Sequence, residues 1–382
     1  MDVELTDEQK LVQAVAREFA EKEVRPIAAA IDREARFPTA TVRRMGELGL
    51  MGIAVPETAG GSGAGTLASA LAVEELARVC ASHAVVMSVN NSLYCDPVLR
   101  FGSAEQHGRF LAPYAAGVRL GCFCLTEPEA GSDASNQSTQ ARREGEHYVL
   151  DGRKAFVTNG REAAAALVFA QTDRARRHEG VTAFLVERDT PGVTVVTTED
   201  TLGIRASDTA ELLFEGCRVP AAARLGVEGQ GFAIAMTALD SGRIGIAALA
   251  VGIAVGAYEA ALEYAQQRTS FGVPIRQQQM VQWMLADMVT SIEAGRQLTL
   301  HAAWLKDTGQ PYAAAAAMAK LFAAEMAMRV TTDAVEVHGR YGAVKEYQVE
   351  RHFRDAKITQ IYEGTSQIQK LIIARHALRQ PD

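Results

Sequence analysis

HYVLDGRKAFVTNG, residues 147–160, contains two short β-rich runs separated by Asp151-Gly152 and followed by Asn159-Gly160, and both of these pairs are typical of turns. Further runs, including ALVFA, TAFLV, GVTVV and ELLF, continue to about residue 225, with another turn pair at Pro191-Gly192. The pattern predicts a compact antiparallel β domain over residues 121–225.

The sequence on either side of this section has helical patterns. Thr6-Asp-Glu-Gln9 fits a capping box, and apolar residues follow it at helical spacing. From about residue 226, alanine-rich helical patterns return, with interruptions near residues 272–274, 309–311 and 339–342. We therefore expect an α+β protein with a helical domain over 1–120, the β domain over 121–225 and a helical domain over 226–382.

The run IGIAALAVGIAVGAY, residues 244–258, has no charged residue. It is shorter than the roughly 20 residues that cross a bilayer, and glycines four apart, here Gly252 and Gly256, also let helices of soluble proteins approach closely. We expect a helix buried on all sides and no membrane insertion.

Composition narrows the class of protein further. The chain has 382 residues, 48% of them hydrophobic, a net charge of −7 and no run of five or six basic residues, so nucleic acid is not an expected partner. The start MDVELTDEQK lacks the features of a secretory signal. Five cysteines are too few and too scattered for a disulfide framework, and we interpret Cys122 and Cys124 as buried strand residues, with no metal site.

The stretch IYEGTSQIQ, residues 361–369, raises a question about function. Glu363 stands between an apolar pair and the start of a predicted helix. A solvated surface glutamate is the ordinary interpretation of such a residue. The other segments of the chain favour a different one.

Eight segments follow one another along the chain: GIAVPETAGGSG (52–63), CFCLTEPEAGSD (122–133), KAFVTNG (154–160), LGIRASDTAELLF (202–214), ALDSGRIGIAA (238–248), RTSFGVPI (268–275), RHFRDAKI (351–358) and IYEGTSQIQ. In this order they resemble the flavin-dependent acyl-CoA dehydrogenase family over essentially the whole chain. Two more segments, MSVNNSLY (87–94) and FGSAEQ (101–106), together with LDSGRIGIA (239–247) inside one of the eight, are most similar to its short-chain, butyryl-CoA-type members. The resemblance implies a helical domain, a β domain and a C-terminal four-helix bundle.

The resemblance implies that Glu363 is the catalytic base, which removes the α-proton of an acyl thioester while the β-hydrogen leaves as hydride to the flavin. Such a base needs a dry site that raises its pKa, and the developing enolate needs fixed donors. In the family these donors are the main-chain N–H of this glutamate and a ribityl hydroxyl. Some relatives carry the base at the position of Gly242, where glycine cannot serve.

The same resemblance implies FAD as the cofactor. Residues expected to contact it from the β section are Phe123, Leu125, Thr126, Ser132, Phe156, Val157 and Thr158, with Ser132 also reaching the substrate. The alternative for TEPEAGSD, residues 126–133, is an ordinary loop, and the alternative for Phe156 is an aromatic residue in the core of a strand. Thr365, Ser366 and Gln367 begin a helix whose free N–H groups suit cofactor oxygens.

The resemblance to the family also implies that four residues contact the adenosine diphosphate half of an FAD in a neighbouring subunit: Arg268, Ser270, Phe271 and Gln279. A cofactor site shared in this way implies a homotetramer built as a dimer of dimers. Arginine suits pyrophosphate and an aromatic ring stacks on adenine. Asp240, Arg243 and Gly364 are expected to line the acyl-CoA channel. An intrahelical ion pair at a subunit contact is the alternative for Asp240 and Arg243.

One segment departs from the family. Where relatives have Gln-x-x-Gly-Gly, this chain has Glu336-Val-His-Gly339-Arg340. These positions approach FAD in the family, and we expect Glu336, Gly339 and Arg340 to do so here. The spacing of Glu336 and Arg340 predicts a compensating helical ion pair, with altered FAD retention as the competing interpretation.

We therefore expect an FAD-dependent dehydrogenase that forms a trans-2-enoyl-CoA and passes electrons to an electron-transferring flavoprotein. The alternatives are an acyl-CoA oxidase, a biosynthetic enzyme acting on a branched or carrier-protein-bound thioester, and a non-catalytic binding protein of the same fold. Only thirteen residues follow IYEGTSQIQ, so the extra C-terminal domain of the oxidases is not expected. The expected location is the bacterial cytoplasm, or the mitochondrial matrix for a mature eukaryotic chain.

Overall fold

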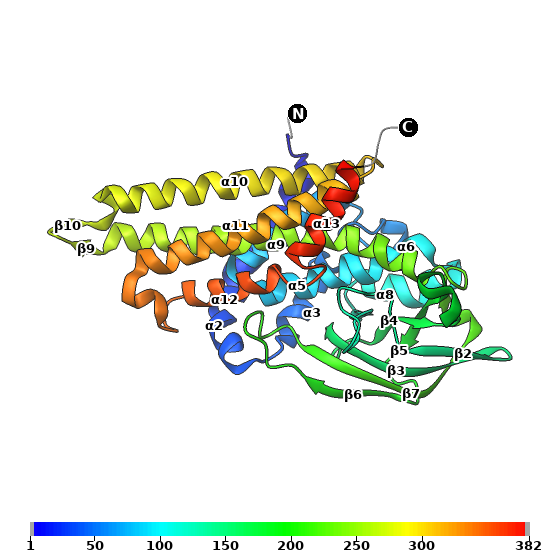
Figure 1. The fold of residues 1–382 in the computed structure, drawn as a ribbon. Helices are drawn as coiled ribbons and strands as arrows, with labels where there is room; N and C mark the ends of the chain where they lie inside the picture. Colours follow the sequence, from blue (N-terminus) through cyan, green and yellow to red (C-terminus); the bar gives the residue numbers. More distant parts are fainter. Residues whose placement is uncertain (1–3, 379–382) are drawn as a thin grey trace.

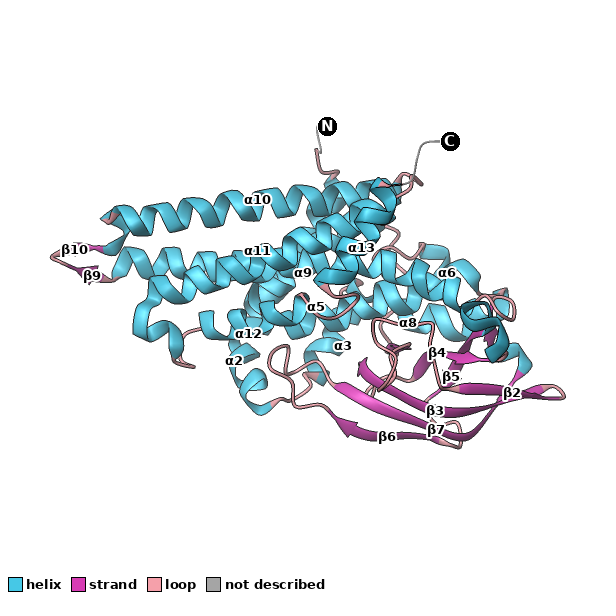
Figure 2. Cartoon of the chain, in the orientation of Figure 1, coloured by secondary structure: helices cyan, strands magenta, loops and turns pink. Residues whose placement is uncertain are grey.

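The computed structural model describes residues 4–378 and has the predicted order of helices, sheet and helices (Figures 1 and 2). The predicted capping box starts α1: Thr6 Oγ1 accepts from the N–H of Gln9, and Gln9 Oε1 accepts from that of Thr6. With η marking 3-10 and π-helical segments, the first section consists of α1 (Asp7–Phe19), η1 (Ala20–Val24), α2 (Arg25–Glu34), α3 (Thr39–Glu47), η2 (Leu50–Gly52), η3 (Glu57–Ala59), α4 (Gly65–Val79), α5 (Ala81–Ser88), η4 (Val89–Cys95), α6 (Asp96–Phe101), α7 (Ala104–Gln106), η5 (His107–Leu111) and α8 (Ala112–Ala115).

The middle section is an eight-stranded sheet in the order β6-β7-β3-β2-β4-β5-β8, with β1 beside β4. Five pairings are antiparallel, while β4 pairs in parallel with β1 and β2, so the sheet is mixed. Cys122 and Cys124 are buried on β1, as expected. The elements are β1 (Gly121–Cys124), β2 (Gln140–Glu144), β3 (His147–Thr158), β4 (Ala165–Gln171), η6 (Arg174–Gly180), β5 (Val181–Glu187), β6 (Val193–Thr198), β7 (Thr209–Pro220), η7 (Ala221–Ala223) and β8 (Arg224–Leu225).

The predicted turn at Asp151-Gly152 is wrong, because β3 runs through it as one strand. The pairing of β3 with β7 shifts register between Leu150 and Gly152, which makes the pair a β-bulge. A Cβ on Gly152 would lie 2.4 Å from Thr139 Oγ1, so glycine lets the strand pass close to this neighbour. A glycine inside a strand is typical of a β-bulge or of a close approach by another backbone segment. Gly152 has both features.

The last section contains three long helices, α9, α10 and α11, which run side by side, and α12 and α13 pack against α11 (Figure 1). The chain changes from helix to strand between Ala115 and Gly121, and back between Leu225 and Gly231. The elements are α9 (Gly231–Gln267), β9 (Thr269–Ser270), β10 (Val273–Pro274), η8 (Ile275–Gln277), α10 (Gln279–Asp307), α11 (Ala313–His338), η9 (Gly339–Ala343), α12 (Val349–Thr359) and α13 (Ser366–Ala377).

Helix α9 forms the centre of the protein and includes the uncharged run 244–258. By length and composition it could cross a membrane, yet 78% of its most apolar window is buried inside the protein. A Cβ on Gly252 would lie 2.3 Å from the carbonyl oxygen of Glu74, and one on Gly256 would lie 2.2 Å from that of Arg78. The two glycines therefore allow α4 to pack directly on α9, which confirms the predicted buried helix.

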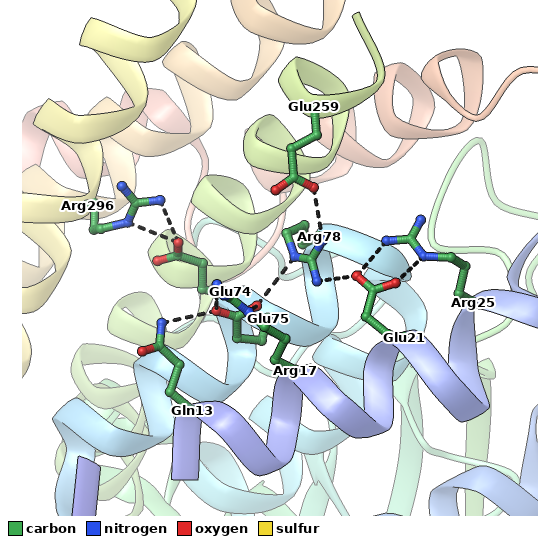
Figure 3. A network of polar contacts seen from close by, with 9 residues as sticks. All are labelled: Gln13, Arg17, Glu21, Arg25, Glu74, Glu75, Arg78, Glu259 and Arg296. Atoms are coloured by element: carbon green, nitrogen blue, oxygen red, sulfur yellow. Dashed lines mark hydrogen bonds and ion pairs between the residues drawn. The ribbon is translucent and has the colours of Figure 1, made fainter. Parts of the chain in front are cut away.

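A network of charged side chains joins α1 and η1 to this core (Figure 3). Arg78 of α4 is buried and contacts Glu21, Glu75 and Glu259, which come from η1, α4 and α9. The pairing satisfies charges that would otherwise be costly to bury. The other members are Gln13 and Arg17, which donate to Glu75, Arg25, which binds Glu21, and Arg296, which binds Glu74.

Candidate active site

Glu363 lies in the turn between α12 and α13. Its φ is 51° and that of Gly364 is 89°, so two consecutive residues are in the left-handed region, which is uncommon for a glutamate. Glu363 as a whole residue is half-buried, but both carboxylate oxygens are buried and have no hydrogen-bond partner within residues 4–378. This environment excludes a solvated surface glutamate.

The electrostatic environment of Glu363 suits a base that works near neutral pH. Burial raises the pKa of its carboxyl to about 7, and the positive charges of Lys320 and Arg243 act in the opposite direction. A general base is most effective when its pKa is close to the operating pH.

The two cations come from different helices. Arg243 of α9 is buried and contacts the Asp240 carboxylate, as the spacing predicted, while its Nε has no partner among the described residues. Lys320 of α11 is fully buried, and its Nζ donates to the carbonyl oxygen of Gly364 at 2.7 Å. Sequence reasoning missed Lys320, although a single lysine inside the apolar run AAAAAMAKLFAA was a signal.

Local hydrogen bonds shape the turn after Glu363. Thr365 caps α13 by accepting from the N–H of Ile368 at 3.3 Å, so the predicted helix start is confirmed. Ser366 Oγ donates to Glu325 Oε1 at 2.6 Å. Gln367 is exposed. The two hydroxyls are therefore engaged within the chain.

Gly242 of α9 lies directly against the carboxylate. A Cβ built on this glycine would be 2.2 Å from Glu363 Oε2 and 2.8 Å from Leu93 Cδ2. Both distances are shorter than real Cβ contacts, so the absence of a side chain at 242 leaves the space that the acid occupies.

The segment η4 connects the environment of Glu363 to the sheet. Leu93 lies beside Gly242, whereas the ring of its neighbour Tyr94 would be 2.2 Å from a Cβ on Gly121, where β1 begins. Asn90 Oδ1 also accepts from the N–H of Gly121 at 2.9 Å. The acid and the first strand therefore lie on two sides of one short segment.

The expected flavin-contacting residues of the β section form two adjacent segments. Phe123, on β1, is followed by Leu125 and Thr126, and the N–H of Ala155 donates to the carbonyl of Thr126 at 2.9 Å, which places the end of β3 beside them. The side chains of Leu125 and Val157 are buried in apolar clusters, so these residues offer only main-chain groups. Thr126 and Thr158 are half-buried and Ser132 is exposed.

Phe156 tests whether this region fits a flat cofactor. Its side chain is 64% exposed and its φ is 55°, a strained conformation for an aromatic residue. The chain thus presents a bare aromatic ring beside Thr126 at an energetic cost, which suits stacking against a planar ring system. The interpretation of Phe156 as a strand-core residue is wrong.

A buried ion pair that sequence reasoning also missed holds the first of these segments. Lys154 Nζ donates to Glu127 Oε1 at 2.7 Å and to the carbonyl of Leu125 at 3.2 Å, and both charged side chains are buried. Lys154 follows Arg153 directly in the sequence, so no local pattern distinguished it from an exposed charge. The pair fixes the loop that follows β1.

Replacement of this lysine tests the role of the pair. We expect Lys154→Met to lower the free energy of unfolding by about 3–5 kcal/mol, because Glu127 would remain buried without its cation. The measurement is urea unfolding, and the control is Arg153→Met, which removes the exposed pair with Glu211 and should cost about 1 kcal/mol or less. Equal losses in the two variants would contradict the assigned role.

A third group of predicted residues lies at the far end of the helices. Figure 1 shows the β9–β10 hairpin at the end of α9 and α10, away from the sheet. Gly242 and Arg268 are 26 residues apart on or next to α9, about 39 Å at 1.5 Å per residue. Phe271 at the hairpin tip is 95% exposed with a φ of 54°. Ser270 is half-buried, and Gln279 begins α10.

The structure brings Arg268 together with the segment that departs from the family. The guanidinium groups of Arg268 and Arg340 lie 5.8 and 5.0 Å from the ring centre of Tyr341. The predicted Glu336–Arg340 pair is wrong, because α11 ends at His338 and Gly339, with a φ of 57°, redirects the chain. Arg340 instead donates to the hydroxyl of Tyr341 at 3.2 Å. Glu336, Gly339 and Arg340 are all exposed.

Two of the cavities in the described part of the chain lie near α9. A small one of about 30 Å³ is next to the active-site stretch of α9 and is lined by Ser241, Ile244, Gly245, Lys306 and Asp96, among others. A larger one, of about 710 Å³, lies between the N-terminal helices, α9 and residues 345–354, and its lining does not include Glu363. The lining of the smaller cavity does not include Glu363 either, although Ser241 is the neighbour of Gly242 in the sequence.

These features define a protein with a buried carboxylate, unpaired within residues 4–378, in the turn between α12 and α13 and a sheet that presents an exposed aromatic ring. Three family models match it in order: the acyl-CoA dehydrogenase N-terminal domain (residues 6–118), middle domain (122–217) and C-terminal domain (229–378). The chain belongs to the acyl-CoA dehydrogenase family.

Individual relatives agree with this assignment. The chain is 52% identical over 377 residues to the mitochondrial short-chain specific acyl-CoA dehydrogenase of Mus musculus, covering 99% of this chain and 92% of the relative. It matches the structure of butyryl-CoA dehydrogenase from Megasphaera elsdenii with a TM-score of 0.98 and 45% identity, over 99% and 100% of the two chains. A chain solved in work on the electron-transferring flavoprotein of Acidaminococcus fermentans and flavin-based electron bifurcation has a TM-score of 0.99 and 48% identity, over 100% of both chains.

Proposed function

We propose that this protein is a flavin-dependent acyl-CoA dehydrogenase that converts a short-chain acyl-CoA thioester to the trans-2-enoyl-CoA. The observation that carries the proposal is the buried Glu363 carboxylate, which has no hydrogen-bond partner among the described residues and whose pKa burial raises to about 7. Short-chain and butyryl-CoA enzymes among the relatives support this substrate class.

In this proposal Glu363 accepts the α-proton of the thioester on a carboxylate oxygen. Burial removes competing water, and Gly242 leaves room for the acid against α9. The main-chain N–H of Glu363 donates no hydrogen bond within residues 4–378, so it is free to bind the thioester oxygen as negative charge develops there. Asp240, Arg243 and Gly364 would border the bound thioester.

FAD is the proposed cofactor, and when bound it supplies the acceptor for the β-hydrogen. The residues that would hold its ring lie in the two adjacent β segments. Phe156 provides an exposed aromatic face, Thr126 and Thr158 are accessible polar groups beside it, and Phe123, Leu125 and Val157 support them. Ser132, Thr365, Ser366 and Gln367 would complete the site near the cofactor phosphates and the substrate.

The far group of residues leads to a proposed homotetramer. Arg268, Ser270, Phe271 and Gln279, with Glu336, Gly339 and Arg340, are too far from the sheet for one FAD to contact both groups in the same chain. In a dimer of dimers they would instead contact the adenosine diphosphate half of a partner subunit's FAD. The 95% exposure of Phe271 is consistent with a role in a partner contact.

The proposed electron acceptor is an electron-transferring flavoprotein. The relative from the work on the A. fermentans flavoprotein supports this partner. We place the enzyme in fatty acid metabolism, in the bacterial cytoplasm or, for a mature eukaryotic chain, in the mitochondrial matrix. An oxidase is the alternative, and it would form hydrogen peroxide in stoichiometric amounts in air.

Anaerobic titration of the purified yellow protein with a panel of acyl-CoA thioesters tests the function. We expect butyryl-CoA to bleach the flavin absorbance, with kcat/KM changing by about tenfold or more for each methylene that the pocket does not accommodate. Bleaching by none of the thioesters would overturn the proposal. Peroxide formed in proportion to substrate would replace it with the oxidase, and a carrier-protein thioester in the panel tests the biosynthetic alternative.

A further inference from the structure

The carbonyl oxygen of Gly364 receives hydrogen bonds from two buried side chains. Lys320 Nζ, from the middle of α11, donates at 2.7 Å, and Gln369 Nε2, from α13, donates at 2.9 Å. The same amide also donates to the carbonyl of Glu363 at 3.2 Å. Both donor side chains are 0% exposed. The turn that carries the acid is thus anchored to two separate helices.

These hydrogen bonds hold the turn in a backbone conformation that is unfavourable for Glu363. Glu363 has a positive φ, which a residue with a Cβ keeps only when its surroundings fix it. The position of the carboxylate against Gly242 depends on that backbone conformation. A loss of anchoring would therefore move the carboxylate, even though neither donor touches it through a hydrogen bond.

Lys320 differs from the other charged residues near Glu363 because its hydrogen-bond partner is a neutral carbonyl group. Arg243 of α9 is paired with Asp240, and on α11 Glu325 accepts from Ser366. The adjacent Tyr362 hydroxyl is neutral, and η4 contributes the apolar Leu93. Lys320 has a carbonyl group as its hydrogen-bond partner, so the Glu363 carboxylate is left as the balance for its buried positive charge. Lys320 and Arg243 are the charges that act on the titration of Glu363, and the other titratable groups around them are Asp240, Glu325 and Tyr362.

We propose that Lys320 is the positioning residue of this active site: it binds the Gly364 carbonyl to hold the Glu363 turn in its strained conformation and supplies the buried positive charge that balances the carboxylate. The proposal rests on the proposed role of Glu363 as the base. It adds a function for a residue on a different helix, 43 positions earlier in the sequence.

Electrostatics support this assignment. Burial lowers the pKa of Lys320 to about 8, while the Glu363 carboxylate acts to raise it. Burial raises the pKa of Glu363, and Lys320 is the largest influence that lowers it. Removing the lysine should therefore raise the pKa of Glu363 further, because its anionic form would lose a partner.

Three variants separate anchoring from charge. Lys320→Met removes both, and we expect kcat to fall by about 10²-fold because the base is misplaced, with the acid limb of the pH profile of kcat/KM moved up by about one pH unit or more. Gln369→Met removes an anchor without a change in charge, so kcat should fall while the limb stays in place. Lys320→Arg should restore the position of the limb and part of kcat.

The wild-type holoenzyme is measured first with butyryl-CoA, so that the two proposals fail separately. If the wild-type flavin is not reduced, the proposed function is wrong. If the wild type is active and Lys320→Met keeps both its kcat and its acid limb, the role of Lys320 is wrong. If Lys320→Met gives no soluble holoenzyme, Lys320→Gln, which keeps an amide donor but no charge, carries the test: an upward shift of the limb supports the proposal, and an unchanged limb overturns it.

Discussion

Glu363→Gln is expected to lower kcat for butyryl-CoA by about 10²–10⁴-fold or more while FAD remains bound. The amide has nearly the same shape as the carboxylate but cannot accept the α-proton. The carboxylate oxygens have no hydrogen-bond partner in the described chain, so the substitution breaks no observed contact and the fold should be retained. The loss should appear in flavin reduction itself, before any electron acceptor takes part.

Stopped-flow reduction of the bound flavin under anaerobic conditions measures this effect. Glu215→Gln, an exposed acid on β7, is the matched control and should reduce at the wild-type rate. In the wild type the rate should fall as the pH drops below about 7, because protonation of Glu363 removes the base. Undiminished reduction in Glu363→Gln would remove this residue from the mechanism.

Gly242→Ala is the second substitution with a large expected effect. The added methyl group would need the space of Glu363 Oε2, which lies 2.2 Å from the built Cβ. That oxygen is the end of a flexible side chain, so the carboxylate rather than the helix should move. A displacement of about 1 Å in a catalytic group can cost 10²-fold, and we expect kcat to fall by about that factor.

Stability measurements distinguish this effect from a loss of folding. Alanine is favoured over glycine inside a helix by roughly 0.5–1 kcal/mol, so the free energy of unfolding should change little. Gly295→Ala on α10 is the control, because the nearest atom to its Cβ would be the flexible end of Met326, at 3.1 Å, and the next ones lie at the ordinary contact distance of 3.6 Å. If both variants keep wild-type kcat, or if Gly242→Ala unfolds, the packing of Gly242 against the acid does not control its position.

Local patterns in the sequence predicted the features that depend on neighbouring residues. The capping box at Thr6 and the buried helix over 244–258 each follow from groups within a few turns of chain, and the structure has both. The pair at Asp151-Gly152 failed because glycine allows a bulge as well as a turn, and the contact that decides between them, with Thr139, comes from elsewhere in the fold. The Glu336–Arg340 pair failed because Gly339 ends the helix between them.

Local sequence patterns could not predict the residues that support the site, because these residues also depend on contacts between distant parts of the chain. Lys320 and Gly364 are 44 positions apart, and Lys154 and Glu127 are 27 apart, so no periodicity connects them. Lys320 was visible as a charge in an apolar stretch, whereas Lys154 follows Arg153 and was not, and the partner of each lysine depends on how the elements pack. The sequence indicated the acid, whereas only the structure identifies the residues that hold it.

The network around Arg78 affects how the protein responds to heat. Hydration of charged groups becomes less favourable as temperature rises, so the cost of removing them from water falls. Contacts of Glu21 and Glu75 with their arginines should therefore keep their strength on warming, while the apolar contacts of α1 gain little more. We therefore expect α1 to unfold together with the central helices on heating, and not in a separate step at lower temperature.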